Sequence, residues 1–257
     1  MITLTTDFGA DSPYVAQMKG SIFRVAPNAT IVDITHSIGA QDVTHGALVW
    51  ADTAFQFPAG SIHVAVVDPG VGTERSIVLA SIDGHWFIAP DNGLLTGVAQ
   101  GRDIEQLRRV ENRQLWREPV SDTFHGRDIM GPVAAHLTLG TSPEEVGPAH
   151  EKLNQIPWPT CKFEQGHITG EVVMVDSFGN LITNIFRSDL DNLPANQEIS
   201  IRCAGQVING ICRTYAEHSP SDFIALFGSS DRLEIAVVSG NASHVLGIER
   251  GESVTVG

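Results

Sequence analysis

Two different patterns of apolar residues divide this sequence, and they limit its fold more than any single motif does. Before residue 155, short apolar runs alternate with stretches of helical spacing, which predicts strands and helices in turn. From residue 167 onward, short β-like segments follow one another with turn residues between them and almost no helical spacing. A chain of 257 residues can hold one large domain or two modest ones, each with its own core. The change of pattern favours two.

The first half predicts a mostly parallel sheet covered by helices. Strand, helix, strand, helix and strand follow in order, which is typical of an α/β domain. The predicted strands are residues 1–9, 29–35 and 61–68, and the predicted helices are residues 14–25, 43–55 and 128–140. Residues 75–91 predict a hairpin that turns at Asp83 and Gly84.

The second half predicts a small domain made of strands. The segments 167–176, 198–205, 223–228, 232–238 and 252–257 predict strands of a β-sandwich or a β-barrel. The stretch before them contains Pro157 and Pro159 and has little periodicity, so it predicts a linker. We therefore expect an α/β domain over residues 1–155, a linker over 156–166 and a smaller β domain over 167–257.

The charge and the cysteines narrow the class of partner. Sixteen basic and thirty acidic side chains give a net charge of -14, which repels nucleic acid and anionic membranes but not a cationic or zwitterionic small molecule. Cys161, Cys203 and Cys212 form no C-x-x-C pair, so neither a disulfide framework nor a zinc knuckle is indicated. The first residues have neither the basic segment nor the long apolar run of a signal peptide. We predict a cytoplasmic protein.

Two acidic residues come directly after predicted strands. Asp7 follows ITLTT, and Asp68 follows HVAVV. Ligands of open α/β sheets bind beyond the carboxyl ends of the strands, where a carboxylate can bind a ribose diol or move a proton. The alternative is that each acid braces a turn, as aspartates often do. Position alone favours neither interpretation.

A second polar cluster, residues 122–131, contains His125. Gly126 has no side chain, which predicts room beside His125 for a small molecule. The alternative is that His125 is structural, as single histidines usually are. The sequence has no metal-binding motif, no G-x-S-x-G elbow and no Walker loop, which argues against metal-dependent chemistry, serine hydrolysis and phosphoryl transfer.

A third cluster lies in the β-rich half. Asp176, Phe178 and Asn180 offer an anion, an aromatic face and an amide, a set that suits an amine and a flat base. The alternative is a simple β-turn built around Gly179. Further along, Ser229 and Ser230 offer hydroxyls and backbone amides that could hold a carboxylate.

Taken in order, six motifs resemble those of the S-adenosylmethionine (SAM) hydroxide adenosyltransferase family, a group of SAM hydrolases related to bacterial SAM-dependent fluorinases and chlorinases. The resemblance covers essentially the whole chain, and its motifs are specific in combination. They are TTDFG, VVDPGVGTER, APDNGLL, TFHGRD, DSFGNLITNI and GSSDRLEIA.

The resemblance implies an N-terminal α/β domain, a smaller C-terminal β-barrel and a homotrimer. SAM would then lie between the N-terminal domain of one subunit and the C-terminal domain of its neighbour. The resemblance also implies that Asp68, Arg75 and His125 activate a water molecule. SAM is the substrate, and no cofactor is implied.

The resemblance also assigns residues to the substrate. Asp7 matches the residue that binds the ribose hydroxyls, Asp176 and Asn180 match contacts to the methionine amine and the adenine, and Ser229 and Ser230 match the carboxylate site. Phe8, Asp11 and Phe178 complete the predicted substrate-binding set. Ser230 stands where the fluorinase carries an arginine, so carboxylate binding here is expected to depend more on backbone amides.

The predicted reaction is displacement at the ribose C5′ of SAM by water, giving adenosine and L-methionine. An arginine beside Asp68 weakens it as a base, so we expect Arg75 and His125 to stabilise a hydroxide-like oxygen as well. The halogenating relatives replace this aspartate with tyrosine, and the fluorinase has serine at the position of Gly126, so this chain resembles the hydrolase branch. The alternatives are a halide-dependent SAM lyase, a sensor that binds SAM or adenosine without turnover, and a purely structural subunit.

Overall fold

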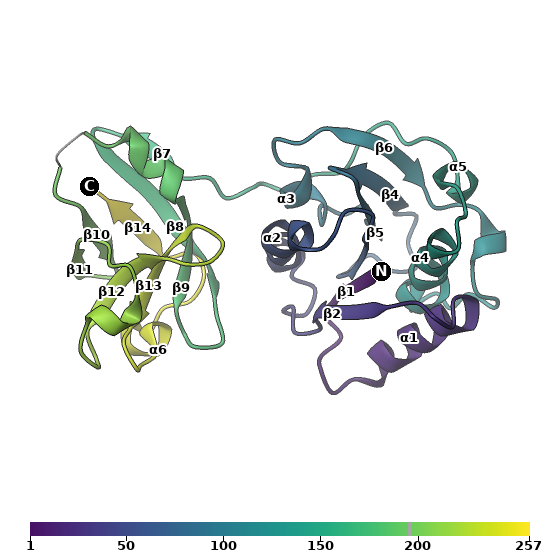
Figure 1. Ribbon diagram of the computed structural model, residues 1–257, viewed down its shortest axis with the longest axis horizontal. Coiled ribbons are helices and arrows are strands. Elements are labelled where there is room, and N and C mark those ends of the chain that lie inside the picture. The colour runs from purple at the N-terminus through teal and green to yellow at the C-terminus, as the bar shows by residue number, and fades with distance from the viewer. Residues whose placement is uncertain (195–196) are drawn as a thin grey trace. The chain divides into compact units, whose positions relative to one another are not determined.

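The structure is a computed structural model, and it describes residues 1–194 and 197–257. The chain forms two compact units, Met1–Trp158 and Pro159–Gly257 (Figure 1). The predicted linker, 156–166, stays a prediction; within it, Ile156 packs on Gly93 of the first unit, and residues 162–164 form a strand of the second. No helix among the described residues has the length and apolarity that crossing a membrane requires.

The N-terminal unit is an α/β domain, as predicted (Figure 1). Its elements are β1 (Ile2–Thr6), α1 (Pro13–Val25), β2 (Ile31–Thr35), α2 (Val43–Thr53), η1 (Ala54–Gln56), β3 (Ile62–Val66), β4 (Ile77–Ile82), β5 (His85–Pro90), α3 (Thr96–Ala99), β6 (Ile104–Arg109), η2 (Arg113–Leu115), the π-helix η3 (Gly126–Met130), α4 (Gly131–Thr138) and α5 (Pro143–Val146). The sheet has the order β2-β1-β3-β5-β4-β6. Strands β2, β1, β3 and β5 are parallel, whereas β4 runs antiparallel to both of its neighbours.

Side chains from the two faces of this sheet build two separate cores. Successive residues of a strand point to opposite faces. Accordingly, Val64 and Val66 of β3 join one core together with α1 and α4, whereas Ala65 and Val67 join the other core beside α2 and α3. A sheet buried on both faces explains why HVAVV is apolar without interruption.

The hairpin predicted at residues 75–91 is confirmed. Strands β4 and β5 pair in an antiparallel way on either side of Asp83 and Gly84. Both turn residues have positive φ, 49° and 73°, which is the backbone that Asp-Gly supplies in a two-residue hairpin. The edge strand β6 was not predicted, because residues 104–109 carry four polar side chains.

The C-terminal unit is the predicted β-barrel-like domain. Its elements are β7 (Lys162–Glu164), β8 (His167–Val175), β9 (Leu181–Phe186), η4 (Arg187–Asn192), β10 (Ser200–Cys203), β11 (Gln206–Asn209), η5 (Tyr215–Glu217), β12 (Phe223–Phe227), β13 (Arg232–Val237), α6 (Ala242–Leu246) and β14 (Ser253–Val256). The order is β11-β10-β14-β8-β9-β13-β12, and all the pairs are antiparallel. The chain after β11 returns to β12, where the Cys212 amide donates to the Ala225 carbonyl, so the sheet nearly closes on itself. The three cysteines are free thiols.

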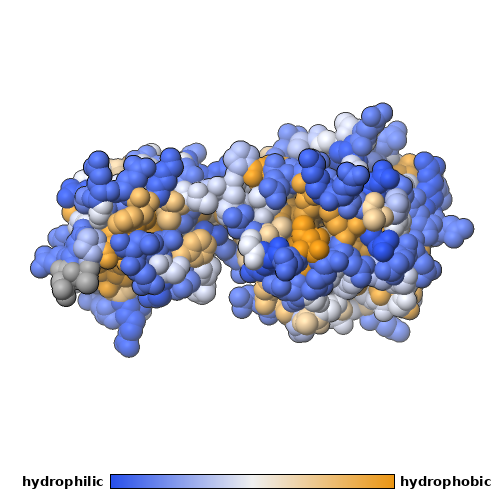
Figure 2. Space-filling view, turned by 90° about the horizontal axis from the view of Figure 1, so that it is seen from above, coloured by the Kyte–Doolittle hydropathy of each residue, from blue (hydrophilic) through white to orange (hydrophobic). Residues whose placement is uncertain are grey.

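Hydrophilic residues cover most of the face of the molecule shown in Figure 2, and apolar residues show between them. The buried apolar residues form two cores in the N-terminal unit and one large core in the C-terminal unit.

Candidate active site

The candidate site begins where two parallel strands end side by side. Thr6 of β1 is paired with Val66 of β3, so the residues that follow both strands lie at the carboxyl edge of the sheet. Asp7 and Asp68 therefore emerge at the same edge, as the sequence predicts. This is the edge at which α/β domains bind their ligands.

The loop that follows β3 is compact and folds back on itself. The Val71 amide donates to the Asp68 carbonyl (3.2 Å), and the Thr73 amide donates to the Gly70 carbonyl (3.1 Å). Gly72 has a φ of 79°, and a Cβ there would lie 2.6 Å from the Asp122 carbonyl oxygen. Only glycine allows this approach, which brings the loop against the segment that carries His125.

Arg75 joins the other two predicted catalytic residues. Its Nε donates to both oxygens of Asp68, at 2.9 and 3.0 Å, and its Nη2 also pairs with Asp68 Oδ2. The same Nη2 lies 2.8 Å from Nδ1 of His125. The side chains of Arg75 and Asp68 are only 12% and 4% exposed. Three residues separated by up to 57 positions in the sequence thus form one continuous chain of hydrogen bonds.

The contact with Arg75 assigns the tautomer of His125. A guanidinium can only donate hydrogen bonds, so Nδ1 of His125 is the acceptor. Burial lowers the pKa of His125, and the neighbouring charge of Arg75 lowers it further, against the opposing effects of Asp68, Asp122 and Asp128. The ring is therefore neutral near pH 7 and carries its hydrogen on Nε2. In this state His125 can donate a hydrogen bond to a ligand but cannot take up a proton through Nδ1.

A buried ionic network holds the segment that carries His125. Asp128 is fully buried and accepts hydrogen bonds from Arg117 (2.6 Å), from Arg127 (2.7 Å) and from the Ser121 amide (3.0 Å). Burial raises the pKa of Asp128, but the hydrogen bonds from Arg127, Ser121 and Arg117 outweigh it, so this pKa lies below its usual range. The network holds the residues on both sides of the turn before the π-helix η3. A π-helix is rare in proteins, and those that occur are often at functional sites.

The expectation that Gly126 leaves room for a small molecule is wrong. A Cβ at Gly126 would lie 3.0 and 3.2 Å from the two methyl groups of Val66, and 3.6 Å from the sulfur of Met18. The absent side chain lets η3 pack closely on β3 and α1. Gly126 therefore serves packing, and through packing it fixes the position of His125.

The predicted ribose-binding residue Asp7 lies at the same sheet edge, where its Oδ2 accepts a hydrogen bond from the Gln41 amide (2.8 Å). Phe8 is half-buried and makes edge contacts with Tyr14 (5.9 Å) and Phe124 (5.5 Å). Asp11 is exposed in the turn before α1. The sequence does not predict these contacts of Tyr14 and Phe124 with Phe8. Tyr14 lies on α1 and Phe124 lies beside His125, and their positions in the sequence give no sign that the rings meet.

In the C-terminal unit, Asp176 organises a tight turn between β8 and β9. Its Oδ1 accepts hydrogen bonds from the amides of Phe178 and Asn180, both at 2.9 Å, and its Oδ2 accepts one from the side chain of Asn180 (3.0 Å). Gly179 has a φ of 84° and touches Asn241 so closely that a Cβ there would lie 2.0 Å from its side chain. The segment thus forms a tight turn around Gly179. It leaves Phe178 75% exposed and Asn180 buried.

Ser229 and Ser230 lie in the turn between β12 and β13, which is closed by a hydrogen bond from the Asp231 amide to the Gly228 carbonyl (3.0 Å). Near this turn, sequence reasoning missed a buried carboxyl group. Glu234 of β13 accepts a hydrogen bond from the hydroxyl of Tyr215. Burial raises the pKa of Glu234, the charge of Asp176 adds to this, and the bond from Tyr215 opposes it.

The predicted residues therefore form two sets, one in each unit. The N-terminal set is centred on Asp68, Arg75 and His125, and the C-terminal set contains Asp176, Phe178, Asn180, Ser229 and Ser230. Among the described residues, no three histidine, cysteine or acidic side chains are grouped so that they could hold a metal ion.

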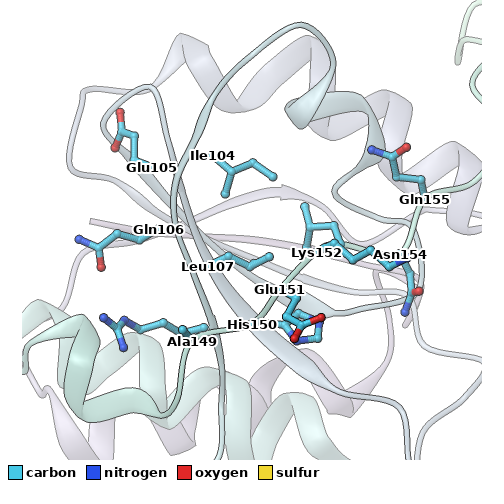
Figure 3. Close-up of a pocket in the computed structure, with 12 residues that line it drawn as sticks. Ile104, Glu105, Gln106, Leu107, Ala149, His150, Glu151, Lys152, Asn154 and Gln155 are labelled. Atoms are coloured by element: carbon cyan, nitrogen blue, oxygen red, sulfur yellow. The ribbon is translucent and has the colours of Figure 1, made fainter.

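Two cavities of the N-terminal unit differ in their relation to this site. One of about 590 Å³ is lined by Arg75 and His125 and reaches the catalytic set from the side of Asp122 and Trp116. The other, of about 870 Å³, lies between β6 and residues 149–155 (Figure 3). None of the predicted site residues lines the larger cavity, whereas Arg75 and His125 both line the smaller one.

Comparisons with known proteins identify the family of this chain. Models of the SAM hydroxide adenosyltransferase N-terminal and C-terminal domains match residues 2–147 and 170–255. The chain is 37% identical over 259 residues to an (R)-S-adenosyl-L-methionine hydrolase of Salinispora tropica, covering 99% of this chain and 97% of that protein. It is 30% identical to a fluorinase of Actinoplanes sp., covering 79% and 77%.

A solved structure has the same fold. The crystal structure of an uncharacterized conserved protein from Thermotoga maritima superposes with a TM-score of 0.93 at 34% identity, covering 100% of this chain and 99% of that one. Together, the two domain models and the full-length relatives show that this chain belongs to the SAM hydroxide adenosyltransferase family.

Proposed function

We propose that this protein hydrolyses S-adenosyl-L-methionine to adenosine and L-methionine. The observation that carries the proposal is the hydrogen-bonded chain Asp68–Arg75–His125 at the carboxyl edge of the sheet, close to the end of β1 that carries Asp7. The full-length similarity to SAM hydrolases supports the same conclusion.

The reaction requires little activation of the leaving group. A water oxygen forms a bond to C5′ while the C5′–S bond breaks. The electron pair of the C5′–S bond stays on sulfur, which becomes the neutral thioether of methionine. One proton of the water must leave. The enzyme therefore has to hold the water in line with the C5′–S bond and stabilise its developing hydroxide character.

The geometry divides these tasks among the three side chains. Asp68 is the proton acceptor of the set, because Arg75 only donates and Nδ1 of His125 is occupied by Arg75. His125 donates from Nε2 to the attacking oxygen, and Arg75 holds the side chains of Asp68 and His125 in place. The partial burial of the set strengthens each of these contacts.

We further propose that Asp176, Phe178, Asn180, Ser229 and Ser230 bind the methionine and adenine ends of SAM, and that Asp7, Phe8 and Asp11 bind at the ribose side. Oδ1 of Asp176 accepts two amide hydrogen bonds within its turn, whereas Oδ2 accepts one and keeps lone-pair capacity for an ammonium group. We propose a homotrimer in which two subunits share each site. A cytoplasmic location stays a prediction from the sequence.

Incubation of the purified protein with SAM tests the proposed reaction. We expect adenosine and methionine in equal amounts by chromatography, and one heavy oxygen in the adenosine when the solvent is H₂¹⁸O. Adenosine without the label contradicts water attack at C5′. Binding of SAM without any product indicates a sensor instead of an enzyme.

A second candidate is a halide-dependent SAM lyase that forms 5′-halo-5′-deoxyadenosine. The similarity to fluorinases favours it as the alternative, although identity and coverage are both lower than for the hydrolases. Product analysis with and without chloride separates the two. We expect adenosine in both cases.

A further inference from the structure

The turn after β5, which begins with Asp91 and Asn92, has no role in the site described so far. It nevertheless contacts both ends of the loop that carries Asp68 and Arg75. In the sheet, β5 stands between β3 and β4. The catalytic loop begins after β3 and ends at the start of β4, where Ile77 is paired with Pro90 of β5. The residues after Pro90 therefore emerge between the two ends of this loop.

Two hydrogen bonds connect this turn to the two loop ends. The side-chain amide of Asn92 donates to the Val67 carbonyl (2.8 Å), directly before Asp68. The backbone amide of Asp91 donates to the Ser76 carbonyl (2.9 Å), directly after Arg75. The turn thus holds the backbone on both sides of the Asp68–Arg75 pair.

The turn is itself firmly anchored. Asp91 is buried, and its Oδ1 accepts a hydrogen bond from the Asn154 amide (2.8 Å). Its Oδ2 accepts from the Asn154 side chain (3.0 Å) and lies 3.1 Å from Nε2 of His150. His150 and Asn154 both belong to the segment 149–155 beside β6 (Figure 3). A rigid outer support of this kind is what keeps a catalytic pair in productive geometry.

We propose that Asn92 is a positioning residue of the hydrolysis reaction, which fixes the end of β3 so that the Asp68 carboxylate meets both Arg75 and the attacking water. This inference rests on the proposed function, because it assigns Asn92 through the role of Asp68. Asn92 does not touch the reacting atoms. A displacement of Asp68 by about 1 Å can lower the rate about 100-fold.

A matched control exists elsewhere in the chain. Asn112 also donates from its side chain to a backbone carbonyl, that of Glu145 (2.8 Å), and also accepts from the amide two residues on, that of Gln114 (3.1 Å). Asn92 makes the same pair of bonds, to Val67 and from Leu94 (3.3 Å). Asn92→Ala and Asn112→Ala therefore remove equivalent bonds at two different places.

The experiment compares kcat and KM for adenosine formation in the parent, Asn92→Ala, Asn92→Asp and Asn112→Ala. Asn92→Asp keeps the acceptor for the Leu94 amide but turns an oxygen toward the Val67 carbonyl. We expect both Asn92 variants to lose at least about tenfold in kcat with little change in KM, and Asn112→Ala to keep the parental kcat. Parental kcat in Asn92→Asp overturns the inference, including in the case that Asn92→Ala fails to fold.

Hydrogen exchange of residues 68–76 provides a readout that needs no activity. We expect these amides to exchange at least about threefold faster in the Asn92 variants than in the parent or Asn112→Ala, because one anchoring hydrogen bond is lost. Unchanged exchange overturns the inference. If the parent itself forms no adenosine, the proposed function is wrong, whereas an active parent with unaffected Asn92 variants refutes only the role of Asn92.

Discussion

At the scale of single residues, the orientation of one guanidinium decides the chemistry of the candidate site. Arg75 donates to Asp68 and to His125 at the same time, which supports the proposed roles of Asp68 as the proton acceptor and His125 as a donor through Nε2. From the sequence, we expect both Arg75 and His125 to stabilise the attacking oxygen. The hydrogen-bond directions favour His125 for this role and Arg75 for holding its two partners.

Replacement of Asp68 tests this division of roles. We expect Asp68→Ala to lower kcat by about two orders of magnitude or more, the scale of a positioned acid-base group, while SAM binding remains measurable. Calorimetry gives the binding constant, and chromatography of adenosine gives the turnover. Turnover at the parental rate would show that Asp68 does not take the proton.

Replacement of Asp176 tests the proposed ammonium contact. In Asp176→Asn the remaining oxygen can still accept the amides of Phe178 and Asn180, but the negative charge and the bond from the Asn180 side chain are lost. We expect the Kd for SAM to rise about tenfold or more, since a hydrogen bond to a charged group is lost. Asp189→Asn is the control, because Asp189 accepts a similar bond from the Phe186 amide. Equal Kd values in the two variants would contradict the assignment.

At the scale of elements, strand ends and short loops position the reacting groups. The parallel pairing of β1 and β3 places Asp7 and Asp68 at one edge, and the loop after β3 returns Arg75 to Asp68. Close packing at Gly72 and at Gly126 brings the segment of His125 against this loop and against β3. Glycine is needed at these contacts for lack of space, not to make room for substrate.

A methyl group at Gly72 tests this packing. Gly72→Ala forces a Cβ to within 2.6 Å of the Asp122 carbonyl, so the segment of His125 has to move. We expect a loss of about 1 to 3 kcal/mol in the free energy of unfolding and a clear fall in kcat. Gly140→Ala is the control, since Gly140 also has positive φ (95°) but has open space around its Cβ position. A parental kcat in Gly72→Ala would show that this contact does not position His125.

A buried histidine pair on two central strands makes the stability of the N-terminal unit depend on pH. His63 of β3 lies 2.8 Å from the Thr3 hydroxyl and 3.0 Å from His85 of β5, and it is completely buried. Burial, together with the charge of the neighbouring His85, lowers the pKa of His63 to about 3. The unfolded chain binds this proton below about pH 6.5, whereas the folded chain does not until about pH 3. Stability is therefore complete above pH 6.5 and falls as the pH decreases toward 3.

Urea unfolding followed by tryptophan fluorescence measures this effect, because all four tryptophans belong to the N-terminal unit. We expect the parent to lose about 2 to 3 kcal/mol between pH 7 and pH 4.5 through His63. His63→Gln removes the titrating group, so its loss over the same range should be smaller by about that amount. The same pH dependence in both proteins would contradict the shifted pKa.

At the scale of the whole molecule, the chain divides its predicted binding residues between two units with separate cores. Neither unit contains all of the residues predicted to bind SAM, which agrees with the proposed sharing of a site between subunits. Light scattering after gel filtration tests this assembly. We expect a mass three times that of the 27.6 kDa chain. Full SAM turnover by a species with the mass of one chain would refute the shared site.

The sequence by itself determined the division into two units of different class and the sheet edge at which Asp7 and Asp68 lie. Alternating apolar periods predicted the α/β unit and the β-rich unit, because those periods reflect which faces each element must bury. The Asp-Gly hairpin followed from local backbone preference. The polar edge strand β6 was missed, because it lacks this apolar signal.

Only the tertiary structure decided which residues share a hydrogen bond across long stretches of sequence. The pairing of Arg75 with His125, of Asn92 with Val67 and of Tyr215 with Glu234 depends on how strands and loops are stacked. The tertiary structure also overturned the prediction that Gly126 leaves room for a ligand. Neighbours such as Val66 fill the space beside this glycine. Local patterns encode secondary structure because its forces act between near neighbours in the chain, whereas these contacts are fixed only when distant segments pack together.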